Sequence, residues 1–220
     1  TFGTMLSDCT ATFNMTGNIV SDNIILISSF TYIAYKAYTV FNTQNYSFTT
    51  GASLITAVAG GGTATLNCGS SAFSVYGFYA STTDNSFNIN FQTSTWTCLR
   101  KAWTYHSTHI VDAGTSQITF GSLLGVSRSI TTAGKSFYTV IINTTNDTYP
   151  WVLAGALSCN NFQIIHGSFN SAGYAITSVG SITIDEVIPT FITLTSSTII
   201  ITGAGNFYIE KKCLFFWKKL

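Results

Sequence analysis

Charge is scarce in this chain of 220 residues, which holds nine Lys and Arg against eight Asp and Glu. Charged residues make up 8% of the sequence, whereas about 25% is usual in soluble domains. This composition excludes a strongly basic nucleic-acid-binding protein, an acidic tail protein and a coiled coil laced with charged pairs. The net charge is only +1, so no nucleic-acid partner is expected.

Long apolar runs are missing as well. The purely apolar stretches, at 24–27, 199–201 and 213–217, are far shorter than the roughly 20 residues that cross a bilayer as a helix. No transmembrane helix is expected. Because the sequence begins at Thr1 and not at Met, we expect either a processed mature form or an excised fragment, from which any signal peptide is no longer visible.

Helical periodicity is the third absence. What the sequence offers instead is Thr interleaved with Ile, Val, Phe and Tyr, the residue types that suit a pleated, half-buried surface. Segments with this alternation are 28–41, 72–80, 86–95, 117–130, 136–143 and 174–184. After residue 190, three short strands separated by Ser-Ser and Gly-Ala-Gly predict a meander. The aromatic content of 15% supplies ample burial, so we expect a folded chain.

Closely spaced strands, broken by Gly and Asn and not by helices, predict an all-β fold of the antiparallel β-sandwich or jelly-roll type. We find no repeat of fixed period, so a solenoid or propeller is not expected. A single domain over 1–210 followed by a distinct tail at 211–220 is the expected organisation. If the domain divides, the boundary falls at 113–116.

Five cysteines occur without the CxxC spacing or neighbouring His of a zinc site. We predict disulfides among Cys9, Cys68, Cys98 and Cys159 in an oxidising compartment, and leave Cys213 unpaired because it lies in the atypical tail. The alternative is that all five are small buried hydrophobic residues in a reducing compartment.

Polar positions are filled by Thr, Ser and Asn in place of Lys and Glu, so little charge repulsion keeps molecules apart. Either glycans supply solubility or neighbouring subunits cover much of this surface. Four triplets match the acceptor motif for N-glycosylation, at Asn14, Asn45, Asn143 and Asn146. The last two lie in a polar stretch before Pro150 and are the best candidates. These motifs predict an extracellular, cell-surface or virion-surface location.

Signatures of catalysis are also lacking. The sequence has no phosphate-binding glycine motif, and the stretch 125–129 lacks the closing glycine of a nucleophile elbow. Asp185 and Glu186 are adjacent, so on a strand they would point to opposite faces. We therefore expect no catalytic residues, no cofactor and no enzymatic activity.

His106, His109 and Asp112 form the only cluster that resembles a metal site. On a strand, a spacing of three residues alternates faces, so no metal is expected there.

Five aromatic residues admit two interpretations. They either belong to the core or form a platform on which a sugar ring stacks, with Asn and Thr bonding its hydroxyl groups. These residues are Trp96, Trp103, Tyr105, Trp151 and Tyr174.

The last ten residues hold four of the nine basic side chains, placed around an apolar block. Leu214, Phe215, Phe216 and Trp217 are the predicted subunit contact, in which the tail inserts into a neighbouring molecule. The alternatives are a final core strand, contact with an anionic partner and peripheral contact with a membrane interface.

Together these features favour a non-catalytic structural subunit of an extracellular or virion-surface assembly, such as a filament, a surface layer or a capsid. Its expected partners are copies of itself or neighbouring structural subunits. The alternative is a carbohydrate-binding adhesin or lectin-like module with glycan partners, and a secreted β-rich hydrolase is third.

Overall fold

The computed structural model describes residues 9–22, 25–29, 31–32, 35–58, 62–80, 87–121, 128–144, 149–185 and 192–209. Every regular element within these ranges is a β-strand. The expected all-β class is therefore confirmed. The described ranges contain no helix that is long and apolar enough to cross a membrane.

The strands form three sheets, which we call A, B and C. Sheet A has six strands: β1 (Cys9–Asn14), β5 (Tyr35–Asn42), β8 (Thr63–Asn67), β11 (Phe87–Asn90) and β14 (Ile110–Asp112), with β4 (Thr31–Tyr32) beside β5. Sheet B has eleven: β2 (Ile19–Ser21), β6 (Phe48–Thr50), β9 (Ala72–Val75), β12 (Thr95–Cys98), β15 (Gln117–Phe120), β17 (Ser136–Asn143), β19 (Leu157–His166), β21 (Ile176–Ser178), β22 (Ile182–Ile184), β24 (Ile199–Ile201) and β25 (Phe207–Ile209). Sheet C has eight: β3 (Ile25–Ser29), β7 (Ser53–Val58), β10 (Gly77–Ala80), β13 (Trp103–Thr104), β16 (Arg128–Thr131), β18 (Trp151–Leu153), β20 (Phe169–Asn170) and β23 (Ile192–Thr193).

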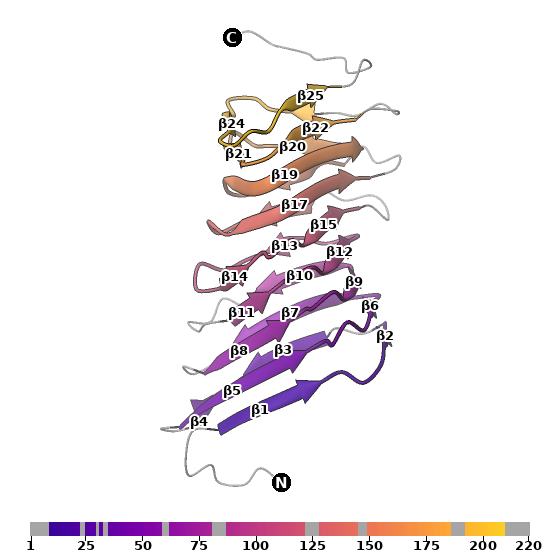
Figure 1. Cartoon of the computed structure of the whole chain (residues 1–220), viewed down its shortest axis with the longest axis vertical. Helices are drawn as coiled ribbons and strands as arrows, with labels where there is room; N and C mark the ends of the chain where they lie inside the picture. The colour runs from indigo at the N-terminus through magenta and orange to yellow at the C-terminus, as the bar shows by residue number, and fades with distance from the viewer. Residues whose placement is uncertain are drawn as a thin grey trace.

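Up to β16 the chain winds through sheets A, B and C in turn, and every strand after β14 belongs to sheet B or sheet C. Each strand lies on a strand of the previous coil. This is a parallel β-solenoid, and Figure 1 shows its strands stacked along the long axis, with β1 and β2 at one end and β24 and β25 at the other. The predicted antiparallel sandwich or jelly roll is wrong. Among the described strands, only β4 with β5 is an antiparallel pair.

The physical reason for the error lies in the connections. Parallel neighbours need a long crossover, which is usually a helix. Here the crossover from one strand to the next in the same sheet consists of strands of the other sheets, such as β9 and β10 between β8 and β11. Each local turn therefore looks like a hairpin in the sequence, although the partner of each strand lies a whole coil away.

The interior is filled by columns of apolar side chains, one from each coil. The parallel register of sheet B places these residues in one inward column: Ile19, Phe48, Phe73, Trp96, Ile118, Val140, Phe162, Ile182 and Phe207. The members from Phe48 to Ile182 are buried. Burying one such side chain contributes roughly 1.5–3 kcal/mol, so these columns hold successive coils together.

Polar residues fill the alternate positions on the outside of the same sheet. Ser74, Thr97 and Thr119 form one outward column, and all three are half-buried. The period-two alternation of strands explains why Thr is so frequent here. Each coil needs β-branched polar residues on its outer face and apolar residues on its inner face.

Left-handed residues turn the corner between sheets A and B. Asn45, Gly69, Gln92 and Gly114 have φ angles of 67°, 57°, 51° and 54° respectively. In all four corners a backbone N–H donates to the carbonyl of the residue three positions earlier, as from Ser94 to Phe91. The segment 113–116, where the sequence suggests a division, is the turn that joins β14 to β15.

Candidate functional site

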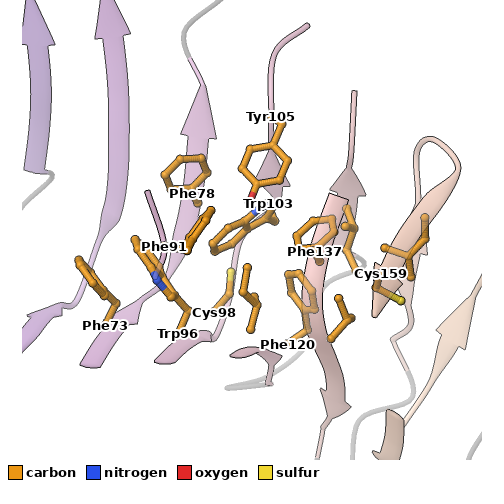
Figure 2. Packing of buried hydrophobic residues seen from close by; sticks show 14 of the residues in the cluster. Phe73, Phe78, Phe91, Trp96, Cys98, Trp103, Tyr105, Phe120, Phe137 and Cys159 are labelled. Atoms are coloured by element: carbon orange, nitrogen blue, oxygen red, sulfur yellow. The ribbon is translucent and has the colours of Figure 1, made fainter. Parts of the chain in front are cut away.

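Four of the five aromatic residues considered for a sugar platform lie in the core. Trp96, Trp103, Tyr105 and Trp151 are buried, and Tyr174 is exposed. Figure 2 shows the rings of Phe73 and Trp96 side by side between the strands; they stack with centroids 3.8 Å apart. The aromatic argument for a carbohydrate site therefore fails, because these rings pack against one another inside the solenoid.

Cys68, Cys98 and Cys159 are free and buried, so the predicted disulfides among them and Cys9 are wrong. Burial raises the pKa of the Cys159 thiol to about 12 and raises those of Cys68 and Cys98 further still. Such thiols behave as small hydrophobic side chains. The side chain of Cys9, and all of Cys213, lie outside the described residues. Without these disulfides, the cysteines no longer support an oxidising compartment.

The two histidines of the metal-like cluster occupy one corner of the solenoid but face different surroundings. His106 Nδ1 lies 2.8 Å from Thr108 Oγ1. His109 is only 4% exposed, with its ring centroid 5.6 Å from that of Phe87. Burial first, and then the nearby His106 and Lys135, lowers the pKa of His109 to about 4.

Asp112 is separate from this pair. Its carboxylate accepts a hydrogen bond from the backbone N–H of Gly114 at 3.0 Å. Within the described ranges, no three His, Cys, Asp or Glu side chains are placed to hold a metal ion. Of the two adjacent carboxylates, Asp185 accepts a hydrogen bond from Gln163 Nε2 at 2.7 Å, and Glu186 lies outside the described residues. So do residues 122–127, which include most of the incomplete nucleophile elbow.

Sequence reasoning missed an asparagine ladder on the outer face of sheet A. The Nδ2 group of Asn42 donates to Asn14 Oδ1, that of Asn67 to Asn42 and that of Asn90 to Asn67, each at 2.7 Å. The next rung is Asp112, which pairs with Asn90 in the sheet. Ladders of this kind accompany in-register parallel stacking. The available signal was an Asn at the end of successive β-rich segments, 28, 25 and 23 residues apart.

The predicted glycosylation motifs differ in exposure. Asn14 is exposed at one end of the ladder, and Asn45 is exposed in a corner, where its Oδ1 accepts from the backbone N–H of Ser70. Asn143 is half-buried in β17, its Oδ1 is buried, and the following Thr144 is fully buried. Asn146 lies outside the described residues. Asn14 and Asn45 are therefore better placed than Asn143.

The two ends of the solenoid are the most distinctive surfaces of the molecule. We call β1 and β2 the N-terminal rung, and β24 and β25 the C-terminal rung. Among the described strands, each of these four has a partner on one side only. Unpaired strand edges present N–H and C=O groups that can accept another strand.

Both rungs also expose apolar side chains. In the N-terminal rung Phe13 is 55% exposed and Val20 79%, and in the C-terminal rung Phe207 is 42% exposed and Tyr208 52%. Phe207 pairs with Ile182, its neighbour in the inward column, which is only 2% exposed. Phe207 therefore occupies a core position, but on the side away from Ile182 no described residue covers it.

The predicted contact residues Leu214, Phe215, Phe216 and Trp217 lie outside the described residues. In the sequence, four residues separate them from the end of β25 at Ile209. Comparison with known proteins adds no identity, because no family model, curated protein or solved structure matches this chain.

Proposed function

We propose that this protein is a non-catalytic structural subunit of an extracellular, cell-surface or virion-surface assembly and that it assembles through the ends of its solenoid. The observation that supports this most is the exposure of column residues at both rungs. Phe13 and Phe207 stand in inward columns whose interior members, such as Leu66 and Phe162, are buried between neighbouring coils. A neighbouring subunit would cover them in the same way.

The composition of the rungs also favours association. Natural proteins usually protect free strand edges with charged residues, proline or bulges. The sequences of the four rung strands, Cys-Thr-Ala-Thr-Phe-Asn, Ile-Val-Ser, Ile-Ile-Ile and Phe-Tyr-Ile, contain neither charge nor proline. Association at these edges is therefore not opposed by charge repulsion or by a missing backbone donor.

The tail adds a second element to the proposal. Leu214 to Trp217 supply four large apolar side chains close in sequence to the C-terminal rung. Burying each in a subunit contact would contribute roughly 1.5–3 kcal/mol before ordering costs. The proposed location rests on the exposed motifs at Asn14 and Asn45.

Sedimentation velocity over a range of concentrations tests the proposal. We expect the full chain to form oligomers whose size grows with concentration. A chain lacking residues 211–220 should remain folded by circular dichroism but associate more weakly. A full chain that stays monomeric at high concentration would refute the proposal, and cooperative loss of folding in the shortened chain would show that the tail belongs to the subunit's own core.

A further inference from the structure

We infer that the partner of the C-terminal rung is the N-terminal rung of a second copy of this chain, with β25 lying beside β2 as a parallel neighbour. This inference rests on the proposed function and specifies its interface. Contacts of this head-to-tail kind join different surfaces of the two molecules, so they extend into open filaments unless a rotation closes the ring.

The two strands match in length and in the order of their side chains. Both have three residues, and both occupy the sheet B side of their coil. Ile19 begins the inward column that Phe207 ends. Placing Phe207 beside Ile19 therefore continues that column from one molecule into the next, and sets Tyr208 beside Val20 on the outer face.

The direction follows from the parallel ladders within the molecule. Only a head-to-tail arrangement keeps β25 and β2 parallel. Two N-terminal rungs facing each other would instead bring antiparallel strands together. The pairing of β22 with β25 shows the arrangement that the next coil would repeat, with Ile182, Thr183 and Ile184 in register with Phe207, Tyr208 and Ile209.

A competing occupant of this edge is the segment 210–220 of the same chain. It has eleven residues, whereas successive coils differ by at least 18 residues in the described register, as from Trp151 to Phe169. Residues 210–220 by themselves are therefore fewer than one described coil. A second copy supplies an end strand for each edge at this end, β2 for sheet B and β3 for sheet C.

Disulfide crosslinking tests the pairing in the full chain. Cys9→Ser and Cys213→Ser leave the three buried thiols as a background. Two proteins are made on this background, one with Val20→Cys and the other with Tyr208→Cys. Neighbouring strands lie about 4.8 Å apart, within the roughly 4.4–6.8 Å between Cα atoms that a disulfide spans. The two substituted positions are exposed and lie at opposite ends of the solenoid.

Mild oxidation of the mixture is expected to give a dimer that contains one chain of each kind, and the chain with both substitutions is expected to give a ladder of multimers. Each single variant alone should stay largely uncrosslinked. Ile110→Cys, at an exposed apolar position on the side of sheet A, is the matched control and should not crosslink to Tyr208→Cys.

Other results separate this inference from the function on which it rests. Oligomers that form without the mixed crosslink, or that crosslink Val20→Cys to itself, overturn the head-to-tail pairing but leave a structural subunit in place. A mixed crosslink that appears only after residues 210–220 are removed shows that the tail covers its own rung and also overturns the pairing. A chain that is monomeric at all concentrations overturns both.

Discussion

The asparagine ladder has a direction, which makes its last rung informative. Each Nδ2 group donates toward the N-terminal end, from Asn90 through Asn67 and Asn42 to Asn14. An ionised Asp112 carboxylate can only accept, so it cannot donate to Asn90 in the same way. It bonds the backbone N–H of Gly114 instead.

Asp112→Asn is therefore expected to add a rung. The new Oδ1 can keep the bond from Gly114 while Nδ2 donates to Asn90, and one such hydrogen bond contributes about 0.5–1.5 kcal/mol. Urea denaturation should show the variant to be more stable by about that amount. Asp22→Asn removes the same charge away from the ladder and serves as the control; equal stabilities of the two variants would contradict the ladder argument.

His109 predicts a loss of stability in mild acid. Its pKa in the folded chain is lowered from 6.5 to about 4, so between these values the unfolded chain binds a proton that the folded chain does not. The contribution of His109 to the free energy of unfolding is fully present above pH 6.5. It falls by up to about 3 kcal/mol as the pH drops toward 4.

The measurement is the difference in unfolding free energy between pH 7 and pH 4, in the wild type and in His109→Gln. The variant should lose this part of the pH dependence, whatever its own stability at pH 7. Parallel pH profiles for the two proteins would show that the pKa of His109 is the same in the folded and the unfolded chain.

Glycosylation should separate the sequence motifs by exposure. In a eukaryotic secretory host we expect glycan on Asn14 or Asn45, since both side chains reach solvent, and none on Asn143, whose side chain is half-buried beside a fully buried Thr144. Peptide mapping before and after enzymatic deglycosylation locates the sites. A secreted folded chain with full occupancy at Asn143 would contradict this ordering.

At the scale of single elements, the corner turns decide how closely coils approach. Gly114 and Gly134 both have positive φ, 54° and 75°. A Cβ on Gly114 would collide with the backbone of Gln92 in the coil below, whereas one on Gly134 would meet nothing within 4 Å. The two glycines share a conformation but differ in their surroundings.

Alanine at these two positions should therefore have unequal effects. Gly134→Ala is expected to cost about 1–2 kcal/mol, the penalty for a left-handed residue with a side chain. Gly114→Ala should cost clearly more, because the backbone of the neighbouring coil has to shift. Thermal unfolding of both variants provides the comparison, and equal losses would mean that the corner is looser than its geometry indicates.

Strand positions were largely predictable from the sequence, but their partners were not. The expected strand at 136–143 is β17, and the three short strands expected after residue 190 correspond to β23, β24 and β25. The meander is wrong, because β23 pairs with β20, β24 with β21 and β25 with β22, all parallel. Alternation is a property of one strand, whereas pairing depends on residues about one coil away.

For the molecule as a whole, unequal coil lengths concealed the repeat. Register partners are 29 residues apart from Ile25 to Leu54, 22 from Gln117 to Thr139 and 18 from Trp151 to Phe169. Insertions at the corners change the period without disturbing the sheets, so a search for a fixed spacing fails. The end rungs could not be predicted either, because their exposure follows only from the stacking.

A stack of this kind is close to one-dimensional, since each coil contacts only the coils before and after it. The stability of a coil then depends on its own residues and on its two neighbours. Interior coils bury column residues on both sides, as Trp96 does between Phe73 and Ile118. The C-terminal rung buries them on one side only, and Phe207 is left partly in solvent.

Hydrogen exchange of the monomer at low concentration should therefore be graded along the solenoid axis. Amides of β9, β12 and β15 must wait for near-global unfolding, because opening them breaks two interfaces and exposes stacked aromatic rings. Amides of β24 and β25 need only the loss of one interface, so local opening with a far smaller free energy suffices. Mass spectrometry of peptides covering 72–75, 95–98 and 117–120 should show exchange slower by orders of magnitude than in peptides covering 199–209. If all these peptides exchanged at one common rate, the solenoid would unfold as a single cooperative unit, and its end rungs would be held as firmly as its centre.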